Sequence, residues 1–341
     1  MCVTQTFYVG DNGGLMSIKE SVLNILNQNV GKTVSGAELA KSLGVTRNSV
    51  WKAINSLKSD GYDIISHPNT GYILNKRADI FNEESILEYL KSPYKIIIYE
   101  KEESSNNIAK ALCQNGEGEG TAVVVKSQTK GKGRMGRSFI SNSENGLYLT
   151  ITLKPKISAD KSLFITVLGA VALAEAIFET SGVDATIKWV NDIYIGEKKC
   201  AGILTEAQLN IETGMLDYAV IGMGINIAPP NGGFDPEIKD IATGIFENNA
   251  PCGYKSRLCA EIIDRFFYYY NQIENKESYM KKYVEKSNII GKEVDMYVGD
   301  TVTSGVAIDI DSNASLVVKT KDKILTFSSG EARVREKGKC L

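Results

Sequence analysis

The stretch "GKGRMGRSFISNSENGLYLTITL", residues 131–153, decides which fold this chain can adopt. Its glycines at 131, 133 and 136 spell G-x-G-x-x-G, the spacing of loops that bind dinucleotide phosphates. Such a loop lies between a strand and a helix, because the helix N-terminus holds the pyrophosphate. Residues 121–127 supply the strand, but the Gly, Asn and Ser cluster and the alternating β-formers after the loop predict a second strand. The pattern therefore disfavours a dinucleotide-binding fold.

The loop "GKGRMGR" itself combines bare backbone with three full positive charges, from Lys132, Arg134 and Arg137. A dinucleotide loop relies instead on backbone N–H groups and the helix dipole. A solvated basic loop without function is an alternative, because charge runs are usually surface. Against it, three glycines in seven residues lose much conformational entropy when the loop orders. We therefore expect a segment that orders when an anion closes it.

On both sides of this loop, predicted strands and helices alternate irregularly. Apolar or alternating runs predict strands at residues 94–100, 121–127, 147–153, 185–195, 199–207 and 217–228. Helices are expected near 106–114, 159–181 and 254–274. The mixed order with hairpin-like neighbours predicts an α+β sheet. The last fifty residues read as short strands with Gly and Asn/Asp turns, which predicts a small β-barrel.

The N-terminal part predicts a winged helix-turn-helix. Residues 17–29 have a helical apolar face, and a second helix begins at Ser35, where Glu38 completes a capping box. After a tight Gly-containing turn, Thr46 caps a third helix. Residues 62–74 then alternate on either side of a Pro-Asn-Thr-Gly turn, as expected for a hairpin wing.

The composition excludes several classes of protein. A chain of 341 residues, 43% hydrophobic and 23% charged, is long enough for two or three soluble domains. Six cysteines without a C-x-x-C pair argue against a zinc site or a disulfide framework and fit a reducing cytoplasm. The one histidine, His67, lies in an expected turn, so Ser-His or Cys-His chemistry is not expected. The longest apolar run, residues 163–178, holds Glu175 and is short for a membrane span, which predicts a buried helix.

Five segments, in order and spacing, resemble motifs of the biotin protein ligases. The loop is similar to the family's G-R-G-R-x-G-R, and "ESSNN" at 103–107 is similar to its D-S-T-N-Q. The others are "KWVND" at 188–192, "KKCAGIL" at 198–204 and "IGMGINI" at 221–227, which resemble K-W-P-N-D, R-K-L-A-G-I-L and I-G-A-G-I-N-M. With the winged helix ahead and the barrel behind, the resemblance extends to the bifunctional members that also repress the biotin operon.

The resemblance implies an α+β chain in three parts. These are a winged helix-turn-helix DNA-binding domain (16–78), a catalytic domain with the class II aminoacyl-tRNA synthetase-like biotin/lipoate ligase fold (79–288) and an SH3-like C-terminal domain (289–341). Residues 75–85 are a plausible linker, and residues 1–15 are expected to be a disordered leader.

The activity implied by the resemblance has two steps. Biotin and ATP give biotinyl-5'-AMP and pyrophosphate, and biotin then passes to a lysine of a biotin carboxyl carrier protein. The adenylate would also act as corepressor, with operator DNA, Mg²⁺ and an adenylate-dependent homodimer as further partners and no membrane. Because the first step opposes two anions, cations must neutralise the repulsion. The catalytic candidates are Arg134, Lys188 and Lys199, and Arg134 should be the most damaging to lose because its planar fork binds two oxygens.

The remaining site residues follow from the matched motifs. Those expected to bind biotin are Ser104, Ser105, Asn106, Gln128, Lys132, Gly133, Arg134 and Lys199. Those expected to bind ATP or the adenylate are Gly131, Arg137, Asn191, Asp192, Gly222, Gly224 and Asn226, with Asp192 also a candidate Mg²⁺ ligand. Gly222 and Gly224 are expected to let the backbone approach the ligand closely. The alternative for Ser104 or Ser105 is a helix N-cap, which is compatible with binding.

Three positions depart from the family pattern or raise an alternative. Val190 stands where the family usually has proline, and Ser105 replaces a threonine. Cys200 follows Lys199, and the related octanoyltransferases use a cysteine nucleophile near a lysine. Its place at the start of an apolar strand instead predicts a buried small residue. Trp189 is expected to belong to the core.

The third helix is the expected recognition helix for DNA. The residues off its apolar stripe are Arg47, Asn48, Ser49, Lys52 and Asn55. Residues 16–78 carry eight Lys or Arg and four Asp or Glu, and this net charge of +4 predicts weak binding by a monomer and a need for two half-sites. The competing function is a ligand-sensing transcription factor without ligase activity. The full set of cations argues against it, because such a protein would not need them.

Overall fold

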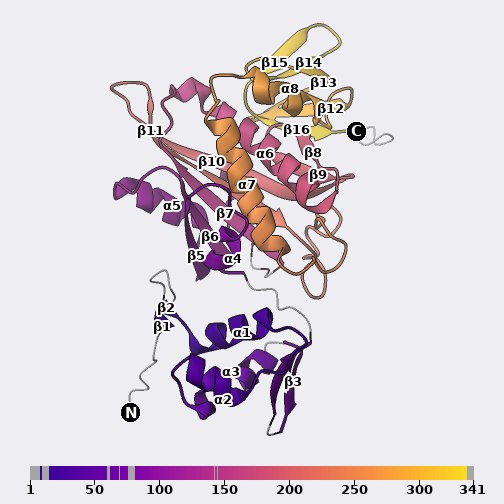
Figure 1. Ribbon diagram of the computed structural model, residues 1–341. Coiled ribbons are helices and arrows are strands. Elements are labelled where there is room, and N and C mark those ends of the chain that lie inside the picture. Colours follow the sequence, from indigo (N-terminus) through magenta and orange to yellow (C-terminus); the bar gives the residue numbers. More distant parts are fainter. Residues whose placement is uncertain are drawn as a thin grey trace. The chain divides into compact units, whose positions relative to one another are not determined.

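The computed structural model describes residues 8–9, 15–59, 62–68, 70–75, 81–141, 143 and 145–335. The chain divides into two compact units between Ile80 and Phe81 (Figure 1). Most of the expected leader, residues 1–15, lies outside the described residues. Within it, β1 (Tyr8–Val9) pairs with β2 (Leu15–Met16).

The first unit is a winged helix-turn-helix, as predicted. Its elements are α1 (Ile18–Gln28), α2 (Gly36–Ser42), α3 (Arg47–Ser59) and the hairpin of β3 (Ile64–His67) and β4 (Gly71–Leu74). The caps are those that the local sequence predicts: Ser35 and Glu38 form a capping box, and Ser49 N donates to Thr46 Oγ1 at 3.1 Å. Val50, Ile54 and Leu57 are completely buried and hold α3 against the other helices.

The second unit is built on a seven-stranded mixed sheet with the order β5-β6-β7-β11-β10-β9-β8. Its strands are β5 (Lys95–Glu102), β6 (Thr121–Gln128), β7 (Gly146–Leu153), β8 (Thr186–Lys188), β9 (Asp192–Ile195), β10 (Lys198–Leu209) and β11 (Leu216–Asn226). Among these described strands only β5 and β6 pair in parallel; every other neighbouring pair is antiparallel. The strand that follows the glycine loop is thus β7, and the mixed sheet that was predicted is confirmed.

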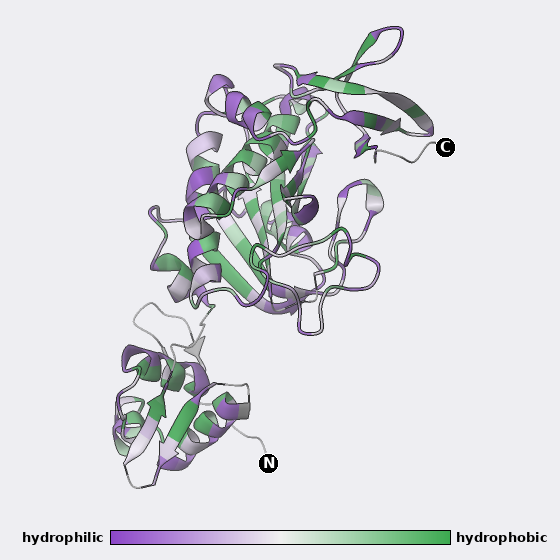
Figure 2. Ribbon diagram, turned by 90° about the vertical axis from the view of Figure 1, so that its right-hand side faces the viewer, coloured by the Kyte–Doolittle hydropathy of each residue, from purple (hydrophilic) through white to green (hydrophobic). Residues whose placement is uncertain are grey.

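Helices cover both faces of this sheet, as the alternation along β6 shows. Ala122 and Val124 belong to the large core with α6 (Leu163–Ser181), α7 (Tyr254–Tyr270) and α8 (Glu277–Glu285). Val123 and Val125 pack on the opposite face, against α5 (Ser105–Gln114). Because both faces are covered, the strands are hydrophobic along most of their length (Figure 2). The polar residues that remain on the α5 face are therefore candidates for a site.

Helix α6 is the apolar run noted in the sequence. With the preceding 3-10 turn η2 (Ala159–Lys161), it is long and apolar enough to cross a membrane by length and composition. However, 72% of its most apolar window is buried inside the protein. It is the central core helix that the sequence predicts.

The C-terminal domain is a five-stranded, wholly antiparallel sheet with the order β15-β14-β13-β12-β16. Its strands are β12 (Glu293–Val298), β13 (Thr301–Ile310), β14 (Leu316–Lys319), β15 (Ile324–Phe327) and β16 (Glu331–Val334). Trp189 Nε1 donates to the carbonyl oxygen of Ala314 at 2.9 Å, and Trp189 is buried. The prediction that Trp189 belongs to the core is confirmed, and its hydrogen bond joins the C-terminal sheet to the catalytic domain.

Three elements differ from the prediction. The run 185–195 is two strands, β8 and β9, because the chain reverses at 189–191, where the Trp189–Val190 peptide bond is cis. Helix α4 (Glu83–Leu87) occupies part of the expected linker, since Asn82 caps it by accepting from Ser85 N at 2.9 Å. Helix α8 was not predicted. Its sequence is rich in Glu and Lys, and its few buried residues join the core beside α6 without forming a long apolar stripe.

Candidate active site

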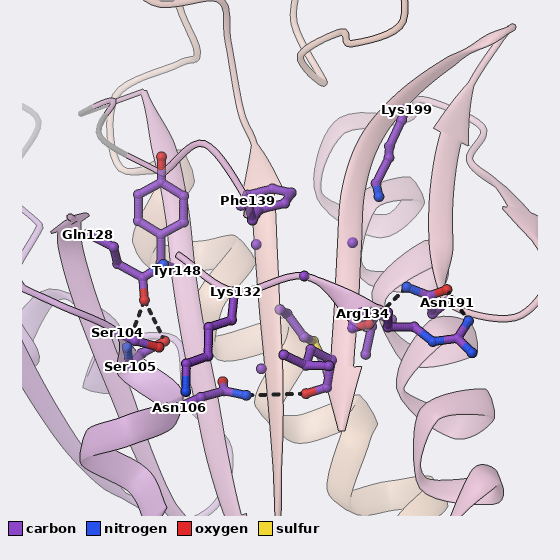
Figure 3. A pocket seen from close by; sticks show the side chains of 17 residues that line it. Ser104, Ser105, Asn106, Gln128, Lys132, Arg134, Phe139, Tyr148, Asn191 and Lys199 are labelled. Carbon is purple, nitrogen blue, oxygen red and sulfur yellow. Dashed lines mark hydrogen bonds between the residues drawn. The ribbon is translucent and has the colours of Figure 1, made fainter. Parts of the chain in front are cut away.

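A pocket opens on the α5 face of the sheet, where β6, β7, β10 and β11 meet the glycine loop (Figure 3). Most of the residues predicted for the site line it: Ser104, Ser105, Asn106, Gln128, Lys132, Gly133, Arg134, Asn191, Lys199, Gly222 and Gly224. Segments separated by as many as 120 residues in the sequence therefore meet here. Those that the sequence did not indicate are Phe139, Tyr148, Gly202, Ile203, Leu204 and Met223. Among them, Phe139, Tyr148 and Leu204 supply apolar side chains, whereas the side chains of Ile203 and Met223 belong to the core on the other face of the sheet.

Gln128 lies at the end of β6, and its side chain is fixed in one orientation. The backbone N–H of Ser105 donates to Gln128 Oε1 at 2.7 Å, and Ser105 Oγ donates to the same atom at 3.0 Å. Because a backbone N–H can only donate, the amide atom that faces it must be the oxygen. Gln128 therefore offers its Nε2 group, which is a donor, to a ligand.

Asn106 lies on the first turn of α5, directly above β11. Its Oδ1 accepts from Thr150 Oγ1 at 2.8 Å, and its Nδ2 donates to Glu206 Oε2 at 2.8 Å. A Cβ atom at Gly222 would lie only 2.0 Å from Asn106 Oδ1. The close approach expected at Gly222 is thus an approach by a side chain of the site, and glycine is required so that Asn106 can lie over the strand.

Gly224 has the same relation to another side chain. A Cβ atom there would lie 2.5 Å from the ring of Phe139, which comes from the end of the glycine loop. The bare backbone of β11 therefore admits Asn106 and Phe139 side by side. Both glycines also line the pocket, so the expectation that they let the backbone approach a ligand stays a prediction beside this packing role.

Ser104 stands at the N-cap position of α5, but the cap interpretation is only half right. Its backbone is extended, as an N-cap requires, yet its side chain makes no hydrogen bond to the helix. Ser104 is 3% exposed and lines the pocket. Its side chain therefore contributes to the pocket and not to capping the helix, and its role in binding stays a prediction.

The glycine loop forms a short hairpin around the 3-10 turn η1 (Arg134–Gly136). Gly133 N donates to the carbonyl oxygen of Arg137 at 2.7 Å, and Phe139 N donates to that of Gly131 at 2.9 Å. Gly136 has a positive φ of 75°, and a Cβ atom at Gly131 would lie 2.1 Å from Ser141 Oγ. Gly131 is thus required by packing within the loop. That the loop orders on an anion stays a prediction.

The cations of the pocket are held by polar partners. Arg134 Nη1 donates to Asn191 Oδ1 at 2.9 Å, Lys132 Nζ donates to Asn107 Oδ1 at 2.6 Å, and Lys199 Nζ pairs with Asp192 Oδ1 at 2.7 Å. Burial lowers the pKa of the Arg134 guanidinium, while the charge of Asp192 acts in the opposite direction. A cation that has lost part of its hydration interacts strongly with an incoming anion. Arg134 and Lys199 therefore make one end of the pocket strongly attractive to phosphate or carboxylate groups.

Three parts of this chain match known protein families. Residues 86–226 match the model of the Biotin/lipoate A/B protein ligase family, residues 19–73 match an HTH domain, and residues 289–335 match the biotin protein ligase C-terminal domain. The bifunctional ligase/repressor BirA of Bacillus subtilis is 35% identical over 232 residues, which cover 67% of this chain and 71% of the relative. This chain belongs to the biotin protein ligase family.

Two further relatives agree with that assignment. The bifunctional ligase/repressor BirA of Escherichia coli is 26% identical over 314 residues, which cover 89% of this chain and 94% of the relative. The structure of the biotin protein ligase from Aquifex aeolicus in complex with biotin and ATP superimposes with a TM-score of 0.60 at 27% identity. That alignment covers 71% of this chain and 99% of the other. Both the order of domains and the catalytic fold are thus those of the family.

The remaining residues predicted for the ligase site lie outside the pocket lining. Lys188 Nζ donates to the Tyr194 hydroxyl at 3.4 Å, and burial lowers the pKa of Lys188 while Asp192 raises it. Arg137 forms an ion pair with Glu331 of the C-terminal domain. Asn226 ends β11 opposite Gly146. Their roles in ATP binding or catalysis stay predictions.

Cys200 does not have the environment of a nucleophile. It is completely buried in the core, and burial raises the pKa of its thiol to about 12. A cysteine must be a thiolate and reachable in order to attack an acyl group. The interpretation as a small buried residue is confirmed, and the octanoyltransferase alternative loses its nucleophile.

In the HTH domain, the residues predicted to contact DNA lie on α3 as expected. Arg47, Asn48 and Lys52 are exposed, whereas Ser49 and Asn55 are half-buried. Trp51, on the same helix, is 54% exposed and was not predicted. An aromatic residue among the polar residues predicted to contact DNA is the signal in the sequence that could have indicated it.

Proposed function

We propose that this chain is an ATP-dependent biotin protein ligase that forms biotinyl-5'-AMP, transfers biotin to a lysine of a biotin carboxyl carrier protein, and represses biotin genes with the adenylate as corepressor. The observation that carries the proposal is a pocket with two chemically different ends under one glycine loop. Ser104, Asn106 and Gln128 form an end of uncharged polar groups (the neutral end), with the Lys132 side chain beside Asn106, and Arg134 and Lys199 form a cationic end (Figure 3).

The neutral end is complementary to the ureido ring of biotin. A ureido group has one carbonyl acceptor and two N–H donors. Gln128 Nε2 is a donor for the carbonyl, and Asn106 Oδ1 is an acceptor for an N–H, while the Ser104 hydroxyl can do either. Phe139, Tyr148 and the other apolar lining residues suit the thiophane ring and the hydrocarbon tail.

The cationic end serves the adenylation step. A carboxylate oxygen of biotin forms a bond to the α-phosphorus of ATP, and the bond from that phosphorus to the bridging oxygen of pyrophosphate breaks. Arg134 and Lys199 reduce the repulsion between the two anions and stabilise the charge that develops. Asn191 accepts from the Arg134 guanidinium and thereby fixes the direction of its fork.

Asp192 is the residue proposed to hold Mg²⁺ beside the phosphates. No group of three or more His, Cys, Asp or Glu side chains in the described part of the chain could hold a metal ion. Mg²⁺ commonly takes one or two carboxylates and completes its shell with water and phosphate oxygens, so a single aspartate fits an ion that is held mainly by ATP. Such an ion would supply positive charge opposite the leaving pyrophosphate.

In the second step, the amine of the acceptor lysine attacks the carbonyl carbon of the mixed anhydride, and AMP leaves. Water would destroy this intermediate, so the pocket must exclude it until the amine arrives. The hairpin of residues 131–137 carries both Lys132 and Arg134 and lies over the pocket, where it can serve this purpose.

The HTH domain supports the repressor half of the proposal. A recognition helix with Arg47, Asn48 and Lys52 exposed suits phosphates and base edges of operator DNA. Because one domain carries little net charge, we propose that an adenylate-bound homodimer reads two half-sites in the cytoplasm. This couples gene repression to the supply of biotin.

The test is incubation of the purified chain with ATP, Mg²⁺, biotin and a biotin carboxyl carrier domain. Mass spectrometry should find one biotinyl group on the acceptor lysine. An unmodified acceptor would leave only the ligand-sensing transcription factor. Protection of DNA from the promoters of biotin genes should increase when biotin and ATP are both present, and equal protection without them would contradict the corepressor role.

A further inference from the structure

A carboxylate behind the pocket controls what the pocket presents to its ligand. We propose that Glu206 is a positioning residue that fixes the side-chain amide of Asn106, so that its oxygen and not its nitrogen faces the N–H of the biotin ureido ring. The proposal rests on the proposed function, because it assigns Asn106 to biotin. Glu206 is not itself among the residues that line the pocket.

The first observation is the pair of contacts that Glu206 makes with α5. Asn106 and Lys110 are one helical turn apart, so both side chains point toward β10. Asn106 Nδ2 donates to Glu206 Oε2 at 2.8 Å, and Lys110 Nζ pairs with Glu206 Oε1 at 2.6 Å. Each oxygen of the carboxylate therefore has its own partner, and neither partner can shift without losing it.

The second observation is that the two ends of the Asn106 amide are distinguished by different groups. A carboxylate can only accept, so the end facing Glu206 must be the NH₂ group. On the opposite side, Asn106 Oδ1 lies 2.8 Å from Thr150 Oγ1, whose single proton is shared with Ser105 Oγ, also at 2.8 Å. Glu206 therefore sets the amide orientation, and the carbonyl oxygen of Leu204, a weaker acceptor 3.5 Å from Nδ2, favours the same orientation (Figure 3).

Sheet register explains why these partners converge on one side chain. Thr150 of β7 pairs with Gly222 of β11, and Gly222 pairs with Leu204 of β10, so the three positions form a row that faces α5. Glu206 lies two residues farther along β10 on the same face. The absence of a side chain at Gly222 lets Asn106 span the row from Thr150 to Glu206.

The carboxylate is ionised under the conditions of the reaction. Burial opposes its charge, but hydrogen bonds from Lys110 and Asn106 and the charges of Lys110 and Lys132 outweigh burial and lower the pKa of Glu206. An ionised acceptor holds an amide N–H more firmly than a neutral one. The Asn106 oxygen keeps its second lone pair for the ligand.

The experiment compares two variants that both remove the charge of Glu206. Glu206→Met removes both acceptor oxygens, so the Asn106 amide loses the partner that sets its orientation. The double variant Lys110→Met/Glu206→Gln also has no ion pair, but the amide that replaces the carboxylate keeps one oxygen to accept from Asn106. The measurements are the dissociation constant of biotin by calorimetry, KM for biotin and ATP, kcat at saturating substrates, and the melting temperature.

We expect the biotin dissociation constant and KM to rise about tenfold or more in Glu206→Met, with kcat and KM for ATP little changed. The double variant should stay within about threefold of the wild-type chain, because the hydrogen bond to Asn106 remains. A biotin affinity of Glu206→Met equal to wild type would overturn the proposal. So would an equal loss in both variants, which would assign the effect to the ion pair, or equal losses in kcat and ATP binding, which would indicate a general structural effect.

Measurements on the wild-type chain distinguish a failure of the role of Glu206 from a failure of the proposed function. If the wild-type chain does not bind biotin, the proposed function fails and the role of Glu206 falls with it. If the wild-type chain binds biotin and transfers it but Glu206→Met behaves in the same way, only the role of Glu206 is overturned.

Discussion

The two ends of the pocket are built in different ways. At the neutral end, Ser104, Ser105, Asn106 and Gln128 are between 3% and 8% exposed, lie at the start of α5 or the end of β6, and the last three are joined to one another or to Thr150 by hydrogen bonds. At the cationic end, Arg134 belongs to the glycine loop and Lys199 is the second residue of β10; the side chain of Arg134 donates to Asn191, and that of Lys199 pairs with Asp192. We infer from this difference that the short side chains of the neutral end are preorganised, whereas the long side chains of Arg134 and Lys199 can adjust to a bound anion.

The comparison makes its largest prediction at the cationic end. Arg134→Ala should lower kcat/KM for adenylation about 10³-fold, because it removes a partly desolvated cation from the reacting phosphate. Pyrophosphate release measures this step without the acceptor protein. Arg257→Ala, which removes an exposed arginine on α7, is the matched control and should leave the rate unchanged. Comparable losses in both variants would argue against a specific role for Arg134.

The neutral end should respond in binding rather than in rate. In Gly222→Ala, the new Cβ would lie 2.0 Å from Asn106 Oδ1, so Asn106 must move. We expect biotin binding to weaken about tenfold to hundredfold and ATP binding to change little, as calorimetry can measure. Gly118→Ala is the control, since a Cβ there would meet no described atom within 4 Å. If Gly222→Ala lowered kcat without changing the biotin affinity, the division between the two ends would be wrong.

The contact that anchors the glycine loop to the C-terminal domain should add a pH dependence to the stability of the fold. The hydrogen bond and charge of Arg137, with Arg333, lower the pKa of Glu331 from 4.5 to about 2. A lowered carboxyl pKa stabilises the fold above the unfolded value, and this stability is lost as the pH falls from about 4.5 toward 2. The melting temperature of wild type should therefore decrease more steeply over that range than that of Glu331→Gln. The effect should be small, because the Arg137 side chain is 57% exposed.

The smallest effect on activity is expected at Cys200, which belongs to neither end of the pocket. Cys200→Ala should change kcat/KM by less than about twofold, because a buried thiol with a raised pKa takes no part in the transfer. Only stability should decrease, by about 1 kcal/mol for the small cavity, as denaturant unfolding can measure. A loss of transfer with adenylation intact would restore the cysteine as a nucleophile.

Much of the site could be predicted from the sequence, because the residues with ligand-facing atoms lie in short continuous motifs. Ser104 to Asn106 and the glycine loop are such segments, and the cap at Ser35 follows from its own neighbours in the same way. Helix-turn-helix and mixed sheet likewise followed from local periodicity. These features depend on contacts within a few residues.

What could not be predicted depends on strand register. Thr150 and Glu206 lie in segments that read only as strand, and nothing local places them beside Asn106. Their role appears once β7, β11 and β10 are aligned. The packing of Asn106 and Phe139 against the glycines of β11 could not be predicted for the same reason, since both side chains come from elsewhere in the chain.

The fixed orientations of Gln128 and Asn106 have a consequence for substrate choice within a family that also includes lipoate ligases. At the end far from the carboxylate, a fatty acid has a methyl group and lipoic acid has a dithiolane ring. Neither end has the N–H and C=O groups of a ureido ring. Binding either acid would strand one amide donor and one amide acceptor against hydrocarbon, and neither amide can turn away without losing its buried partner. Discrimination against such acids would then come from the cost of unsatisfied polar atoms and not from the size of the cavity.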